Sequence, residues 1–152
     1  MTDIGHLEQE FISEQKGEGS LSAFLTDGDT SEYIGWDVNP EDLEAIYFEG
    51  IGVPRWESLQ ADSVEAQTAL YWERFNSLMD PIPMIGRMRD TDETIEYTSD
   101  EVQQLLGECG EILLGAKDAK ARRSVQKLSL AAAKATERNA GLRFSPSRIP
   151  NL

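Results

Sequence analysis

The side chains most often used for nucleophilic catalysis are scarce in this chain, which has one histidine, His6, and one cysteine, Cys109. Catalysis by an imidazole base, a Ser-His-Asp triad or a Cys-His pair would have to pass through His6, close to the N-terminus. Cys109 lies in an apolar stripe, with no cationic side chain nearby in sequence to lower the pKa of its thiol. We expect His6 to be solvated and Cys109 to be buried and inert. The sequence therefore predicts no catalytic residue.

An acidic segment, Asp27-Gly28-Asp29-Thr30-Ser31-Glu32, begins like a calcium-binding loop, with oxygen-bearing side chains at its first, third and fifth positions. Its sixth position is Glu32, where such a loop needs glycine for its sharp turn. Its twelfth position is Val38, where a bidentate glutamate would close around the ion. The segment is therefore predicted to be a polar turn.

A second acidic group, Asp90, Asp92 and Glu93, has oxygen ligands suited to Mg²⁺, but three acids within one tight turn are typical of a solvated hairpin tip. Residues 50–54 (Gly-Ile-Gly-Val-Pro) lack the third glycine of a phosphate-binding loop, and the proline blocks the helix start that such a loop needs. A single cysteine excludes an internal disulfide and a multi-cysteine zinc site. We expect no metal and no cofactor.

Charge is divided by position along the chain. Residues 1–114 carry 26 Asp and Glu against 5 Lys and Arg, a net of −21, whereas residues 115–152 carry 2 against 9, a net of +7, which gives −14 in total. A negative surface favours cationic partners and repels phosphates, so we expect a basic protein partner and no nucleic acid. Five cations are expected to share one side of the last helix and to pair with acids of residues 1–114: Lys120, Arg123, Lys127, Lys134 and Arg138.

The elements that would position these residues are indicated by capping signals and apolar periodicity. Helices are predicted to begin at four capping residues: Asn39, Asp62, Thr98 and Asp118. Gly50 is expected to end the first of these helices and Gly141 the last. The second helix has an apolar stripe over residues 64–78 that includes Trp72, and we assign this stripe to the core.

The third helix contains Gly107 and Gly110, which we expect to let a neighbouring element pack close. Strands are predicted over residues 21–25 and 34–36, which flank a polar turn. A strand, turn and strand are also predicted between residues 84 and 97, and a last strand over residues 142–144.

These elements predict an α+β fold in a single domain over residues 1–152, because a chain of this length can bury one core. We expect a C-terminal antiparallel helical hairpin, further helices and a small antiparallel sheet. Residues 1–20 are expected to form a short helix or a loose N-terminal segment, and residues 145–152 a tail.

Residues 80–144 resemble small, mostly uncharacterised bacterial proteins of the kind found as immunity proteins to polymorphic toxins. The resemblance rests on structural motifs: Pro81 and Pro83 leading into Met84-Ile85-Gly86-Arg87, then Tyr97-Thr98-Ser99-Asp100-Glu101-Val102, Glu108-Cys109 and Gly141-Leu142-Arg143-Phe144. It implies a stand-alone cytoplasmic α+β protein whose acidic surface masks a basic toxin. It carries over no binding residue.

Candidate partner-binding residues are acids in predicted turns and tryptophans beside predicted loops. Trp36 and Trp56 are flanked by glycine and charged residues, so one of them is a candidate exposed anchor. The full set is Asp27, Asp29, Trp36, Asp37, Trp56, Asp90, Asp92 and Glu93.

We expect a non-enzymatic acidic binding protein, an immunity-type inhibitor that masks a basic toxin. Two alternatives stay open. One is a nucleic-acid mimic with regularly spaced carboxylates on an elongated face, and the other is an enzyme whose carboxylates converge in a pocket from distant segments. The longest aliphatic run, Ile112-Leu113-Leu114, is too short to span a bilayer, and the N-terminus lacks a signal-peptide pattern, so we expect a cytoplasmic protein without a membrane span.

Overall fold

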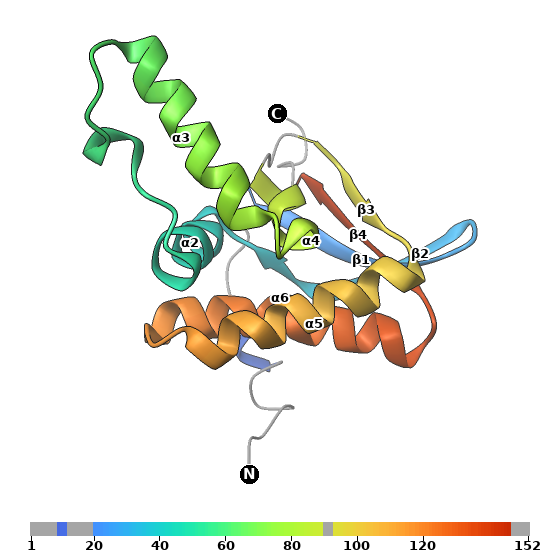
Figure 1. Ribbon diagram of the computed structural model, residues 1–152. Coiled ribbons are helices and arrows are strands. Elements are labelled where there is room, and N and C mark those ends of the chain that lie inside the picture. The colour runs from blue at the N-terminus through green and yellow to red at the C-terminus, as the bar shows by residue number, and fades with distance from the viewer. Residues whose placement is uncertain (1–8, 12–19, 90–92, 147–152) are drawn as a thin grey trace, which may run out of the picture.

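The computed structural model describes residues 9–11, 20–89 and 93–146. Its centre is a four-stranded antiparallel sheet with the strand order β2-β1-β4-β3 (Figure 1). The strands are β1 (Leu21–Asp27), β2 (Thr30–Val38), β3 (Ile95–Tyr97) and β4 (Gly141–Pro146). Two long helices, α5 (Ser99–Gly115) and α6 (Ala119–Glu137), pack against this sheet. The α+β class is therefore confirmed.

The two predicted strands at the start of the sheet are confirmed as the hairpin β1–β2. Its turn is formed by Gly28 and Asp29, since Asp27 pairs with Thr30. Gly28 has φ +62°, a left-handed conformation that glycine adopts without strain in tight hairpins. Side chains along β1 alternate between the core and the opposite side, as the period of a strand requires.

The helix predicted to begin at Asn39 is confirmed, but it ends later than expected. The backbone N–H of Asn39 donates to the carboxylate of Asp42 at 2.9 Å, and α2 (Pro40–Glu44) continues as a π-helical segment, η1 (Ala45–Ile51). Gly52, with φ +92°, ends it rather than Gly50. A Cβ at Gly50 would lie 3.6 Å from the Cβ of Ala121, so Gly50 lies where η1 approaches α6.

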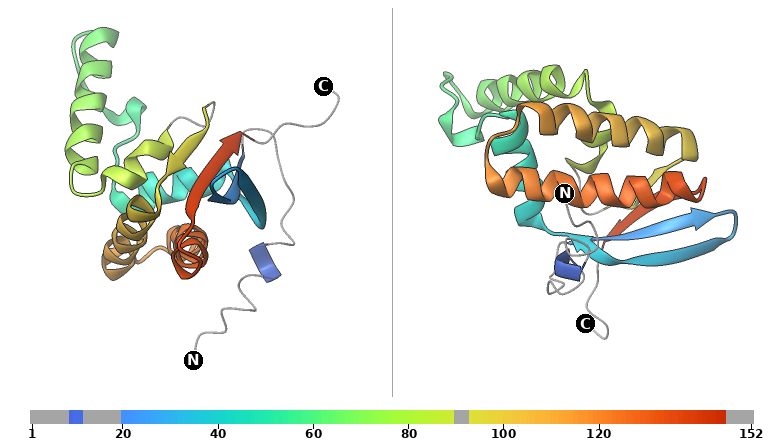
Figure 2. Two further views of the ribbon diagram at one scale, coloured as in Figure 1. Left: turned by 90° about the vertical axis from the view of Figure 1, so that its right-hand side faces the viewer. Right: turned by 90° about the horizontal axis from the view of Figure 1, so that it is seen from below.

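The second predicted helix is present as α3 (Val64–Met79), but its capping residue and its surroundings differ from the prediction. Ser63, not Asp62, caps it by accepting the backbone N–H of Ala66 at 3.1 Å. It packs against α4 (Pro83–Gly86) and a short 3₁₀ turn, η2 (Trp56–Ser58), and it extends away from the sheet and the α5–α6 layer (Figures 1 and 2). The assignment of its whole stripe to the core is therefore wrong.

The strand predicted over residues 84–89 is also wrong, because this segment is helical. It forms α4 and the 3₁₀ turn η3 (Arg87–Arg89). The carboxylate of Glu108, on α5, accepts the backbone N–H groups of Met84 at 3.2 Å and Ile85 at 2.9 Å. A distant side chain thus satisfies the free N–H groups at the start of α4 and stabilises the helical turn. The strand β3 pairs with β4 instead.

Helices α5 and α6 lie side by side, joined by residues 116–118 (Figure 2). The capping box predicted at Thr98 and Glu101 and the cap at Asp118 are confirmed. Gly107 and Gly110 have no atom within 4 Å of the position of a Cβ, so the expected close packing at these glycines is wrong.

The end of α6 and the two ends of the chain differ from the prediction in detail. Asn139, with φ +53°, follows α6, and Gly141 already belongs to β4. β4 continues to Pro146, into the predicted tail. Residues 9–11 are helical and Phe11 is buried against Trp36, with 6.0 Å between the ring centroids, so this part of the N-terminal segment is held by the core.

Candidate functional site

The predicted partner-binding residues do not converge on one site. Asp27 and Asp29 are exposed at the tip of the β1–β2 hairpin. Trp56 is exposed on η2, and Glu93 is exposed just before β3. These positions belong to three separate parts of the molecule, so the set describes a dispersed acidic surface rather than a single pocket.

Two further members of the set, Trp36 and Asp37, are buried on β2, so the interpretation of Trp36 as an exposed anchor is wrong. The Trp36 ring packs with Phe11, and the ammonium of Lys134 lies 6.0 Å from its centroid. The hydroxyl of Tyr33 donates to Asp37 at 2.7 Å. Burial, with this hydrogen bond, raises the pKa of Tyr33 above its ordinary value. The last two members, Asp90 and Asp92, lie outside the described residues.

A buried ion pair joins α6 to the segment that follows β2. Lys127 is 0% exposed, and its Nζ lies 2.7 Å from Oδ2 of Asp42 and 3.2 Å from the carbonyl oxygen of Asp37. Asp42 also accepts hydrogen bonds from the hydroxyl of Ser124 at 2.8 Å and from the backbone N–H of Asn39 at 2.9 Å. These partners all belong to the fold, so the cluster ties α6 to α2, and the charges of Lys127 and Asp42 are engaged with one another.

Other cations of α6 are also held within the molecule. Arg138 lies 2.6 Å from Glu32 on β2, and Arg123 lies 3.9 Å from Glu10. The expected pairing of the basic helix with acids of residues 1–114 is confirmed for these two side chains and for Lys127. These pairs offset part of the positive charge of the C-terminal segment.

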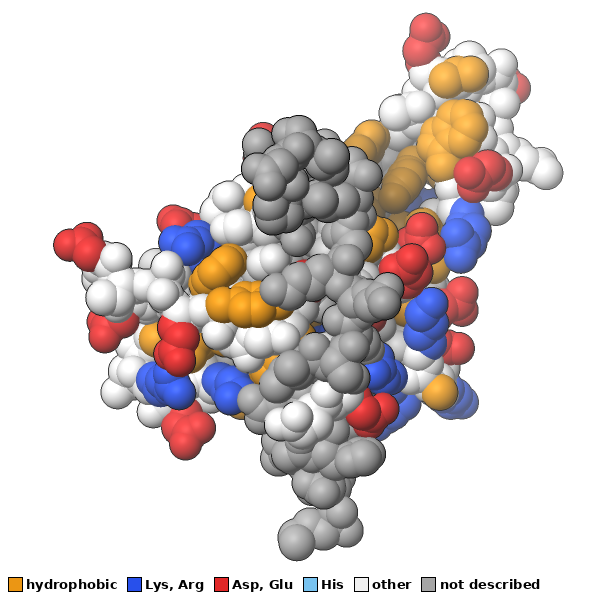
Figure 3. All heavy atoms as spheres, turned by 180° about the vertical axis from the view of Figure 1, so that it is seen from behind, with side chains coloured by type: hydrophobic (Ala, Val, Ile, Leu, Met, Phe, Trp, Pro, Cys, Tyr) orange, Lys and Arg blue, Asp and Glu red, His pale blue; other side chains and the backbone are white. Residues whose placement is uncertain are grey.

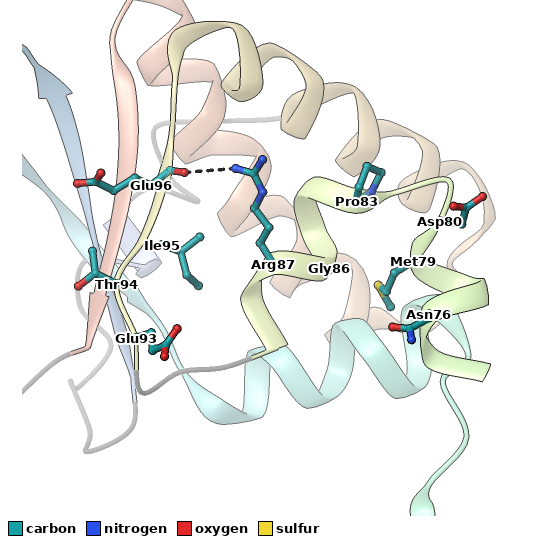
Figure 4. A pocket seen from close by; sticks show the side chains of 10 residues that line it. All are labelled: Asn76, Met79, Asp80, Pro83, Gly86, Arg87, Glu93, Thr94, Ile95 and Glu96. Atoms are coloured by element: carbon teal, nitrogen blue, oxygen red, sulfur yellow. Dashed lines mark hydrogen bonds between the residues drawn. The ribbon is translucent and has the colours of Figure 1, made fainter. Parts of the chain in front are cut away.

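A hollow of about 560 Å³ lies between the end of α3, α4 and β3 (Figure 4). Asp80, Glu93 and Glu96 contribute acidic side chains to its lining. The guanidinium of Arg87 donates to the carbonyl oxygen of Glu96 at 3.3 Å and lies 2.5 Å from the carboxylate of Glu101. The hollow therefore presents acidic side chains beside an arginine that is already engaged within the fold.

The pair formed by Arg87 and Glu101 makes stability depend on pH. The hydrogen bond from Arg87, with that from the Thr98 backbone, lowers the pKa of Glu101 from 4.5 to about 2. The charged carboxylate therefore stabilises the fold above pH 4.5, and this contribution is lost as pH falls toward 2. We expect Glu101→Gln to cost no more than about 1 kcal/mol at neutral pH, because the pair is exposed to solvent. In urea melts the difference from wild type should vanish near pH 2; an unchanged difference there would contradict this linkage.

Cys109 is buried on α5, as predicted, and burial raises the pKa of its thiol to about 12. At pH 8 a thiol of this pKa is ionised to about 1 part in 10⁴, and the thiolate is the reactive form. We expect the folded protein to resist an aromatic disulfide reagent at pH 8 and to react completely in denaturant. Rapid, complete modification of the folded protein would show that the thiol is accessible and reactive.

Three of the four large hydrophobic side chains that are exposed in the described ranges lie on residues 55–74, which we call the α3 arm. Val64 is 66% exposed, Trp72 44% and Trp56 37%. The indole N–H of Trp56 donates to the hydroxyl of Thr68 at 3.4 Å, which holds η2 beside α3. Figure 3 shows hydrophobic side chains gathered on this projecting part, with acidic side chains at its edges.

The stripe on α3 continues from the α3 arm into the core. Phe75 and Met79 are buried, and the Phe75 ring lies 5.7 Å from that of Tyr47 and 5.5 Å from that of Trp72. The same face of one helix thus packs against the body at its C-terminal end and meets solvent toward its N-terminal end. Sequence periodicity predicts the apolar stripe, but it does not predict how much of the stripe other elements bury.

Comparison with known proteins found no matching family model, no matching curated protein and no matching solved structure. Within the described ranges, no three His, Cys, Asp or Glu side chains are grouped as they would be around a metal ion. No helix in the same ranges combines the length and the apolar character needed to cross a bilayer. Arguments about function therefore rest on the charges and surfaces of the chain itself.

Proposed function

We propose that this chain is a non-enzymatic acidic binding protein whose partner is a basic protein, in the manner of an immunity-type inhibitor that masks a basic toxin. The observation that carries the proposal is that cations of the basic helix pair with acids of the same chain. Lys127, Arg123 and Arg138 pair with acids of the chain itself, while the net charge is −14. The excess of carboxylates is thereby available to the surface.

A surface of this sign has a physical role in association. Complementary potentials steer a cationic partner toward the acidic face and raise the association rate, whereas polyanions such as nucleic acids are repelled. Acids are exposed in several places, among them Asp27 and Asp29 on the hairpin tip and Glu93 beside the hollow. This distribution supports binding to a basic protein surface.

The engagement of the reactive groups supports binding over catalysis. Cys109 is buried with a raised thiol pKa, and Lys127 and Asp42 neutralise one another in the interior. A catalytic acid, base or nucleophile must reach the substrate, which these three side chains do not do as they are placed.

The proposal is tested by the charge of the partner. The protein is immobilised at low ionic strength, exposed to lysate of its source cell, and the retained proteins are identified. We expect a partner with an isoelectric point above about 9, such as a basic C-terminal toxin domain encoded beside this gene. Retention of an acidic partner, with no basic protein retained, would contradict the proposal.

A further inference from the structure

Part of the α3 stripe is exposed to solvent, although Trp72 packs against Tyr71 and Phe75 at its base. An amphipathic helix normally buries its apolar face, and clustered exposed aromatic side chains mark interaction surfaces. Trp56 and Trp72 are the side-chain types most often found at the energetic centre of protein interfaces. Two exposed tryptophans therefore lie on one projecting element, next to exposed Val64.

The α3 arm also carries the charge that selects a partner. Four acids on it are exposed: Glu57, Asp62, Glu65 and Glu73. Glu65 precedes Trp72 by seven residues, which is two helical turns, so the two lie on the same side of α3. Of the two cations on the arm, Arg55 lies 4.2 Å over the ring of Phe48 at the base of the arm. Arg74 is exposed on α3, so the arm carries four acids against two cations, a net charge of −2.

We propose that the exposed apolar face of the α3 arm is the docking surface for a basic amphipathic helix of the partner, with Trp56 and Trp72 as anchors and Glu65 on the charged rim. This inference rests on the proposed function and gives it a location. Helix-on-helix docking suits an exposed stripe of this kind, because the partner's apolar residues at helical spacing cover the stripe while its Lys and Arg side chains meet the acidic border.

Charge complementarity favours such a partner over a second copy of the chain. Two copies would each bring a net charge of −14, and their arms would set carboxylates against carboxylates. The same acids repel an anionic lipid surface. A cationic helix neutralises these acids while it covers the indoles, so it gains both from apolar burial and from opposite charge.

The structure supplies its own optical probe for this docking. Trp56 and Trp72 lie exposed on the α3 arm, whereas Trp36, the third tryptophan, is already buried. Covering the arm should therefore shift the emission of the exposed indoles to shorter wavelength, with little change from Trp36. The probe is a peptide of about 18 Leu and Lys residues at helical spacing. Its matched controls are a scrambled peptide of the same composition and a Leu and Glu peptide of the same pattern.

We expect the patterned Leu and Lys peptide to bind and to shift the emission, and the scrambled peptide to bind at least about tenfold more weakly. Trp72→Ala should raise the dissociation constant at least about tenfold, whereas Leu114→Ala, an exposed apolar residue on α5, should change it less than about twofold. Glu65→Lys should weaken binding more than Asp29→Lys at the hairpin tip. Equal effects of Trp72→Ala and Leu114→Ala would overturn the inference.

The remaining outcomes separate this inference from the proposed function. If the Leu and Lys peptide binds but every arm variant behaves as wild type, the docking site is wrong and the preference for a basic partner stands. If the Leu and Glu peptide binds the arm as tightly as the Leu and Lys peptide, the arm is a docking surface and the preference for a basic partner is wrong. A dimer in solution that Trp72→Ala abolishes would show that a second copy occupies the arm and would overturn the assigned occupant.

Discussion

Replacing Lys127 with methionine is expected to lower the free energy of unfolding by about 3 to 5 kcal/mol, because it leaves the buried carboxylate of Asp42 without its counter-charge. Lys127 is 0% exposed and Asp42 is buried beside it, with 2.7 Å between Nζ and Oδ2. Methionine keeps most of the volume of the lysine stem. The loss therefore comes mainly from the uncompensated charge rather than from a cavity.

Urea denaturation of three variants tests this account of the ion pair. The double variant Lys127→Met with Asp42→Asn should recover part of the loss, because the neutral amide oxygen can still accept from the Asn39 backbone while the amide NH2 donates to the hydroxyl oxygen of Ser124. Lys120→Met, at the exposed start of the same helix, should stay within about 0.5 kcal/mol of wild type. A loss below about 1 kcal/mol for Lys127→Met would contradict a buried, charged pair.

Truncation of Leu128 is expected to have the second largest effect on stability. Leu128 is 0% exposed on the face of α6 that enters the core, so Leu128→Ala should cost about 2 to 5 kcal/mol through lost burial and the cavity left behind. Leu114→Ala is the matched control, since Leu114 is 85% exposed at the end of α5 and its truncation should cost less than about 0.5 kcal/mol.

The same urea melts would decide whether α6 is packed as described. Leu106, on α5, is only partly buried, so Leu106→Ala should fall between the two extremes. Equal small effects of Leu128→Ala and Leu114→Ala would contradict the placement of α6 in the core.

The parts of the fold that could be predicted from the sequence are those decided by nearby residues. The turn at Gly28 lies between two short apolar runs, and the cap at Thr98 is completed by Glu101 three residues later. Asp118 begins α6 for the same local reason. The predicted α+β class rests on such signals, and it is confirmed.

The parts that could not be predicted are decided by residues distant in sequence. Residues 84–89 have apolar side chains that suit a strand, but the carboxylate of Glu108 satisfies the N–H groups at the start of α4 and makes the segment helical. For α3, periodicity predicts the apolar stripe, but it does not predict that the stripe is buried at Phe75 and Met79 and exposed at Val64 and Trp72. The glycine and charged neighbours of Trp36 in the sequence make it a candidate exposed anchor, although the fold buries its ring against Phe11.

The candidate site shows the same division between local and distant information. The charge imbalance predicted that the basic helix pairs inside the molecule, and Lys127 and Arg138 do so. The sequence does not predict that Asp42 is the buried acid, because acidic residues are common in the first turn of a helix. Trp56 and Trp72 are 16 residues apart in the sequence, and the fold brings them onto one arm by holding η2 beside α3.

The most direct test of the central claim, that an acidic surface recruits a basic protein, is the dependence of the association rate on salt. The rate constant for association with the captured partner is measured by stopped flow as ionic strength rises from about 0.01 M to 0.15 M, which shortens the Debye length from about 30 to 8 Å. We predict that the rate constant falls at least about tenfold over this range, because the attraction is screened. A rate constant that stays within about twofold over the whole series would contradict electrostatic recruitment.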